Sequence, residues 1–171
     1  MRHSPPSLQV PPAPGGAGTT RPAAADDAAA GAEPTAAAAR RGQQVVVVET
    51  PPEIMSRQQL PHFIGISADT AGARGLSMHL VVIPPGAAAE PHYHKGFESA
   101  IYLLQGQVLT RYGPGLKESV ITEAGHFLFI PPDVPHQPVN LSQSEPARAI
   151  VVRNDPNEQE NVVLYDPASD D

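Results

Sequence analysis

From residue 45 onward, short apolar or β-branched runs alternate with proline- and glycine-rich turn residues. The run VVVVE at 45–49 precedes two prolines, and the run at 76–83 is followed by Pro84, Pro85 and Gly86. Short runs bounded by turn residues are typical of β-strands. The pattern predicts strands at 45–49, 62–67, 76–83, 91–94, 99–105, 107–112, 118–122, 126–130, 137–141, 147–153 and 162–165. A short helical turn is expected at 54–59, and turns at 69–75 and 113–115.

The spacing of these strands indicates the fold class. Many short strands about 8 to 12 residues apart, with no helices between them, favour an all-β sandwich or barrel. Residues 1–42 differ, because they are rich in Ala, Pro and Gly and lack an apolar cluster that could offset the entropy of ordering. They predict a disordered tail. The alternative, an Ala-rich helix over 23–41, is interrupted by Gly31 and Pro34.

Length and composition narrow the function classes. The 171 residues suffice for one domain with a single core, expected at 43–165, followed by an acidic end at 166–171. A net charge of -7 argues against a general nucleic-acid binder and against binding to anionic membranes. The absence of cysteine excludes disulfides and thiolate chemistry. Without a signal-like or membrane-spanning apolar run, a cytoplasmic location is expected.

Two histidines and a glutamate lie in the segment 84–106. Alternate side chains of an extended strand share a face, so His92, His94 and Glu98 are expected to project to the same side. Such nitrogen and oxygen donors suit Fe(II), Mn(II), Zn, Ni or Cu better than Ca or Mg. A further imidazole from another strand would complete a metal site, and His136, in the segment 125–140, is the candidate.

Both segments resemble the motifs of the cupin family. The first motif is matched by Gly86, five residues, His92, one residue, His94, three residues and Glu98, with Gly106 resembling its closing glycine. The second motif is matched by Gly125, Pro131, Val134, Pro135, His136 and Asn140.

Two positions depart from the usual cupin pattern. Gly106 falls one residue later after Glu98 than usual, and Asp133 stands where the family usually has glycine. Because Asp tolerates left-handed backbone better than most residues, a turn at Pro132 and Asp133 remains feasible.

The cupin resemblance implies a jelly-roll β-barrel, or double-stranded β-helix, with one divalent transition metal ion per chain. The implied ligands are His92, His94, Glu98 and His136. Such a set leaves one or two positions open for substrate or oxygen. The resemblance therefore implies a metal-dependent enzyme of the dioxygenase, decarboxylase, lyase or isomerase class, acting on a small oxygenated substrate.

Other functions and the assembly stay open at this point. The alternative to an enzyme is a non-catalytic barrel that binds a small molecule. A metal-free sugar-nucleotide epimerase and a storage role are less favoured, because the ligand set is complete and there is no second cupin repeat. Cupin-like barrels commonly pair through edge strands, and the apolar run 45–48 predicts such a homodimer.

The remaining candidate residues carry weaker signals. Tyr102 lies four residues after Glu98, so on an extended strand it is expected on the same face and to point into the barrel. Its hydroxyl could donate a proton there. The simpler interpretation is that Tyr102 is a half-buried aromatic residue of the core. His79 is expected to be structural and His126 to lie on the surface. His62 could face the barrel mouth or a loop. The pair Phe127 and Phe129 is expected in the core.

Overall fold

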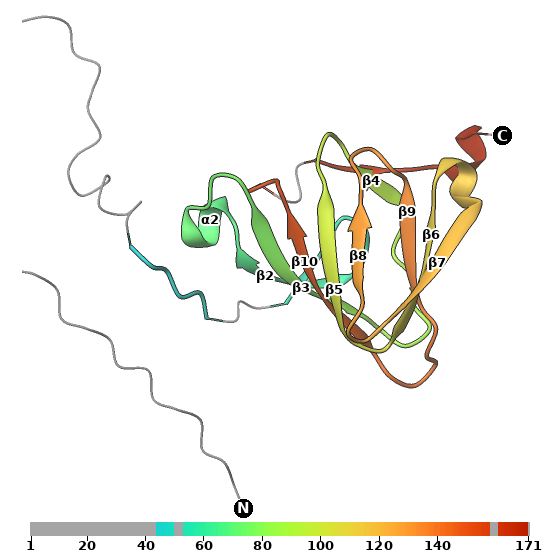
Figure 1. Cartoon of the computed structure of the whole chain (residues 1–171), viewed down its shortest axis with the longest axis horizontal. Helices are drawn as coiled ribbons and strands as arrows, with labels where there is room; N and C mark the ends of the chain where they lie inside the picture. Colours follow the sequence, from blue (N-terminus) through green and yellow to red (C-terminus); the bar gives the residue numbers. More distant parts are fainter. Residues whose placement is uncertain (1–43, 50–52, 158–160, 171) are drawn as a thin grey trace, which may run out of the picture.

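The computed structural model describes residues 44–49, 53–157 and 161–170, and within them two antiparallel sheets face each other (Figure 1). The strands are β1 (Ile54–Met55), β2 (Pro61–Ile66), β3 (Ser77–Ile83), β4 (His92–His94), β5 (Ser99–Gln105), β6 (Gln107–Tyr112), β7 (Glu118–Glu123), β8 (Phe127–Ile130), β9 (His136–Asn140), β10 (Ala147–Arg153) and β11 (Val162–Leu164). Short helices are α2 (Ala68–Ala71), η1 (Pro114–Leu116) and η2 (Pro167–Asp170). None of the helices in these described ranges is long and apolar enough to cross a membrane.

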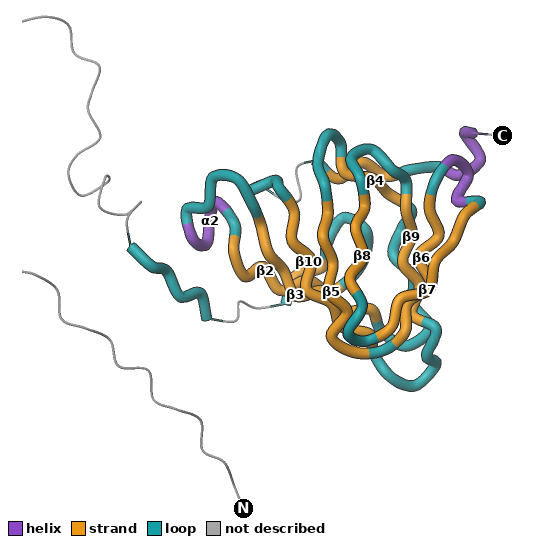
Figure 2. Tube along the Cα trace, viewed as in Figure 1, coloured by secondary structure: helices purple, strands orange, loops and turns teal. Residues whose placement is uncertain are grey.

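The strand order is that of a jelly roll. One sheet runs β1-β2-β3-β10-β5-β8 and the other β11-β4-β9-β6-β7, so neighbours in space are mostly distant in sequence. Figure 2 shows how little of the described chain is helical. The expected all-β jelly-roll barrel is confirmed.

Alternating side chains of β3 and β10 build the core. These paired strands both bury every second residue, among them Val81, Ile83, Ala149 and Val151. Burial of alternate apolar side chains is what fixes the register of a sheet with one face toward the core. The last inward position of β10 is occupied by Arg153, which extends the same face beyond the apolar cluster.

The structure confirms the predicted strands at 99–105, 107–112 and 147–153 without change, and most others shift by one residue. Two predictions are wrong. Residues 45–49 form no strand, and Val45 is 96% exposed. Residues 54–59 form no helix, because Ile54 and Met55 pair with β2 instead. The predicted disordered tail, residues 1–42, lies outside the described residues. The homodimer stays a prediction.

The expectation for Phe127 and Phe129 is also wrong. They lie on the edge strand β8 with 82% and 58% of their surfaces exposed, whereas Ile130 is buried. Aromatic residues in a strand are often assigned to the core for their size, but the pleat decides which face they occupy.

Candidate metal centre

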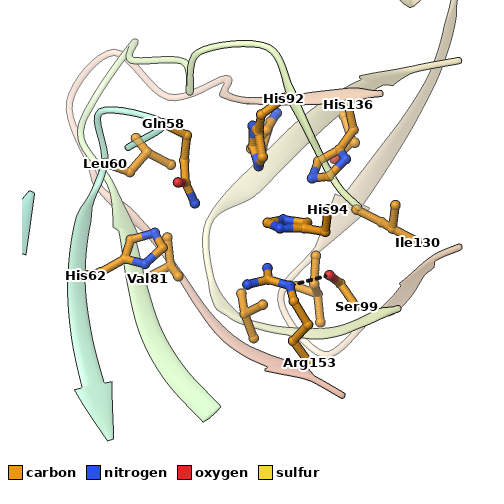
Figure 3. Close-up of a pocket in the computed structure, with 14 residues that line it drawn as sticks. Gln58, Leu60, His62, Val81, His92, His94, Ser99, Ile130, His136 and Arg153 are labelled. Atoms are coloured by element: carbon orange, nitrogen blue, oxygen red, sulfur yellow. Dashed lines mark hydrogen bonds between the residues drawn. The ribbon is translucent and has the colours of Figure 1, made fainter. Parts of the chain in front are cut away.

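Three histidines meet between the two sheets (Figure 3). His92 and His94 lie on β4, and His136 is directly opposite His92 on β9. All three are buried, and one ring nitrogen from each lies within 4.8 Å of the others. Nitrogens bound to one ion at about 2.1 Å lie roughly 3 to 3.5 Å apart, so small side-chain adjustments would bring all three onto one ion.

Backbone carbonyls orient two of the rings. The Nδ1 of His92 lies 2.7 Å from the carbonyl oxygen of Glu90, and the Nδ1 of His136 lies 2.9 Å from that of Val134. A carbonyl can only accept, so both Nδ1 atoms carry the proton and both Nε2 atoms keep a lone pair for a metal. This arrangement is typical of metal-binding histidines.

His94 provides a further sign that the group fits an ion. Its Nδ1 is buried and has no hydrogen-bond partner. An orphaned buried nitrogen is costly, and a bound metal or ligand in the pocket is one way to satisfy this ring. The donor set and the burial therefore both fit a transition metal.

Burial keeps the three imidazoles neutral. It is the main reason that the pKa of His136 is lowered to about 4; the hydrogen bond to the Val134 carbonyl opposes the shift and the positive charge of Arg153 adds to it. The pKa values of His92 and His94 are likewise lowered, first by burial and then by neighbouring positive charges. Neutral imidazole is the form that binds a metal, so no deprotonation is needed at neutral pH.

Asp133 ties the two histidine segments together. It has φ of 61°, so the left-handed turn considered for this position is present. Its Oδ1 accepts a hydrogen bond from the Gly96 N–H at 2.9 Å, and its own N–H donates to the His94 carbonyl at 3.2 Å. The loop before His136 is thereby held against the turn after His94.

Glu98 does not join the histidines, and the prediction that it shares their face is wrong. The strand β4 ends at His94, and a turn at Lys95 and Gly96 intervenes before β5 begins at Ser99. Alternation restarts after the turn, so Ser99 is buried and Glu98 is exposed. Counted from Ser99, Gly106 falls where the usual pattern places it, which accounts for the one-residue departure seen from Glu98.

The restart of the alternation after this turn also makes the expectation for Tyr102 wrong. Tyr102 lies on the outer face of β5, where its ring is 4.7 Å from that of the exposed Phe127. The inward position beside it belongs to Ile101, which lines the histidine pocket. The hydroxyl of Tyr102 therefore cannot act on a ligand in that pocket.

The histidine pocket has a volume of about 60 Å³ and a polar wall that the sequence did not predict. Arg153 is 4% exposed, and its Nε donates to the Ser99 hydroxyl at 3.1 Å. Gln58 and His62 line the opposite side (Figure 3). An arginine at an inward position of an otherwise apolar strand was the signal for this wall.

Of the other histidines in the described ranges, His79 and His126 do not line the pocket of the three-histidine group. His79 is buried with its ring 6.2 Å from that of His62, and His126 is exposed. His62, which the sequence left open, is buried in the pocket wall.

Two facing antiparallel sheets in jelly-roll order, with a histidine group between them, define a double-stranded β-helix barrel. A model of the cupin domain matches residues 79–153, a range that begins in β3, ends with β10 and contains all three histidines. The chain thus carries a cupin domain. No curated protein matches the sequence.

Solved structures of similar fold include oxalate decarboxylases. A Lactobacillus farciminis oxalate decarboxylase in a formate complex is 21% identical with a TM-score of 0.56, over 66% of this chain and 33% of that chain. A Bacillus subtilis oxalate decarboxylase with Mn(II) centres is 20% identical with a TM-score of 0.56, over 67% and 30%. An uncharacterized Klebsiella pneumoniae protein with a double-stranded β-helix domain is 15% identical with a TM-score of 0.54, over 68% and 90%.

These identities support the fold alone. This chain spans about a third of the two oxalate decarboxylases, whereas it spans most of the Klebsiella protein.

Proposed function

We propose that the protein binds one divalent transition metal ion per chain through His92, His94 and His136, and acts as a metal-dependent enzyme on a small oxygenated substrate. The observation that carries the proposal is the group of three buried, neutral imidazoles, two of them oriented by backbone carbonyls. When bound, the ion supplies a Lewis acid or, if it is iron, a site of oxygen chemistry.

The three-imidazole set bears on the choice of metal. Imidazole suits Fe, Ni, Cu and Zn, whereas carboxylate ligands favour Mn. Since Glu98 lies outside the group, the donor set favours Fe(II), Ni, Cu or Zn over Mn. Three protein ligands also leave open positions for a substrate, as in catalytic zinc sites.

A non-catalytic binding barrel is the second candidate, and one observation favours it. Tyr102, the group expected to donate a proton, does not line the pocket. Turnover of a small substrate by the metal-loaded protein separates the two candidates, because a binding barrel would be stabilised by its ligand without converting it.

The test of the metal site is elemental analysis of the wild-type protein and two variants, purified without added metal or chelator. His136→Ala should lower the metal content from near one ion per chain to below about a tenth, since it removes one of three ligands. Glu98→Ala, the matched control, should leave it unchanged. Circular dichroism checks that both variants fold. Equal metal content in His136→Ala and wild type would contradict the site.

A further inference from the structure

A second and larger pocket lies where the two sheets end, and we call it the seam pocket. It has a volume of about 370 Å³. The strands β7 and β8 supply part of its lining, and each is the last strand of its sheet. Its walls include Tyr112, Val120, Leu128, Phe129, Pro131 and Val134.

The seam pocket adjoins the histidine pocket. Thr110 and Ile130, which are 3% and 6% exposed, line both of them. Figure 3 shows Ile130 on the side of the histidine pocket away from Gln58 and His62. Tyr112 is paired directly with His136 across β6 and β9. Since neighbouring strands lie about 4.8 Å apart, one small molecule can extend from the seam pocket to an ion on the histidines.

The exposure of Val120 shows that the inner face of the barrel is accessible here. Val120 pairs with Thr110, and Thr122 pairs with Val108, so both residues of β7 occupy its inner face. Thr122 is 8% exposed, whereas Val120 is 37% exposed. An apolar side chain that faces inward and still meets water gains free energy when a ligand covers it.

The lining restricts the chemistry of the ligand. The described residues that line the seam pocket include no charged side chain. The hydroxyl of Tyr112 is hydrogen-bonded to the Glu118 side chain, so the ring is the part of Tyr112 left to contact a ligand.

The sizes of the two pockets point to a ligand that uses both. The volume of the seam pocket is within the range of roughly 300 to 1,000 Å³ typical of small-molecule sites. The histidine pocket, at about 60 Å³, has room for only a few non-hydrogen atoms. A ligand with a small polar end and a bulkier apolar end matches this pair of pockets.

We propose that the seam pocket binds the apolar part, an aromatic ring or a branched alkyl group, of a small molecule whose polar end is held at the three histidines. This inference rests on the proposed function, and it names the substrate class of that site. A second copy of the chain is a poorer occupant, because Thr110 and Ile130 are buried between the sheets, out of reach of the surface of another barrel.

The experiment compares two ligands that share a metal-binding hydroxamate group. Acetohydroxamate carries a methyl group, and phenylacetohydroxamate carries a benzyl group. Calorimetric titration of metal-loaded protein gives both affinities, and metal content is measured on the same samples. Wild type should bind phenylacetohydroxamate at least about tenfold more tightly, because its ring leaves water for the apolar walls.

Val120→Asp places a carboxylate in the seam pocket and should remove this preference, because the ring would then displace water from a charge. The affinity for acetohydroxamate and the metal content should stay unchanged. Ile121→Asp is the matched control on the outer face of β7, and it should keep the preference.

Phe129→Ala provides a second variant if Val120→Asp does not fold. It should reduce the preference at least about threefold, since it removes part of the apolar wall. Its matched control is Phe127→Ala, because Phe127 is also exposed on β8 but does not line the seam pocket.

Three results would overturn the inference. Equal affinity for both hydroxamates, or no binding of either, at one metal ion per chain would exclude the apolar end and leave the metal site standing. A homodimer that Val120→Asp converts to a monomer in light scattering would assign the seam pocket to a second copy of the chain. Wild-type protein without metal would overturn the proposed function and, with it, this inference.

Discussion

The side chain of Asn140 connects loops at one end of the barrel, and its removal should cost much of the folding stability. Asn140 is 1% exposed. Its Nδ2 lies 3.0, 3.1 and 2.8 Å from the carbonyl oxygens of Ile83, Pro84 and Glu145, and its Oδ1 accepts from the Ser142 N–H at 3.0 Å. The two N–H groups of the amide therefore serve three carbonyl oxygens, and the amide oxygen accepts one backbone N–H.

The magnitude follows from these contacts. Each lost hydrogen bond costs about 1 kcal/mol net, and buried partners left without water add to this. Asn140→Ala should thus lower the free energy of unfolding by about 3 to 5 kcal/mol, a large share of the 5 to 15 kcal/mol typical of a domain. Asn140→Asp keeps the shape but turns a carboxylate oxygen toward three carbonyl oxygens, so it should be destabilised at least as much at pH 7.

Urea unfolding followed by circular dichroism measures both variants. Asn157→Ala is the matched control, because Asn157 is exposed and its hydrogen bond to Asp155 Oδ1 is donated by the backbone N–H, which the substitution keeps. The control should change stability by less than about 0.5 kcal/mol. A loss below about 1 kcal/mol in both Asn140 variants would refute the reasoning that this amide holds the loops.

Two further predictions concern a glycine and the buried histidines. Gly106→Ala should destabilise the protein more than Gly72→Ala in thermal melts. Both glycines have positive φ, but a Cβ at Gly106 would lie 3.0 Å from Ala147 Cα and one at Gly72 would meet nothing within 4 Å; equal losses would contradict this. His136 by itself should cost metal-free protein up to about 3 kcal/mol of stability between pH 6.5 and pH 4, because unfolded His136 takes up a proton at 6.5 and the folded side chain only at about 4. His136→Gln should reduce this pH dependence in urea titrations, and an unchanged slope would exclude His136 as its source.

Much of the fold was predictable because the signals are local. Apolar runs between proline and glycine turns predicted most strands to within a residue, since strand formation depends on neighbouring positions. The failures were also local in origin. Val45–Val48 has strand-like composition, but the structure pairs it with no strand among the described residues, and composition alone does not supply a partner.

The candidate site was only partly predictable, because the alternation of side chains between the two faces of a strand holds only within one continuous strand. Alternation placed His92 and His94 on one face, and in the structure the pairing of β4 with β9 brings His136 beside them. Extending the same alternation through Lys95 and Gly96 failed, because a turn resets which residues face inward. Glu98 and Tyr102 were misplaced for this single reason.

The sequence by itself determined the all-β class, the strand positions and the histidines of the site, because period-two patterns, turn residues and motif spacing act over a few residues. Only the tertiary structure decided the opposite wall, where Ser99 and Arg153 face the histidines across the space between the sheets. These two residues are 54 positions apart in the sequence, and no local pattern specifies which side chains a folded barrel places together.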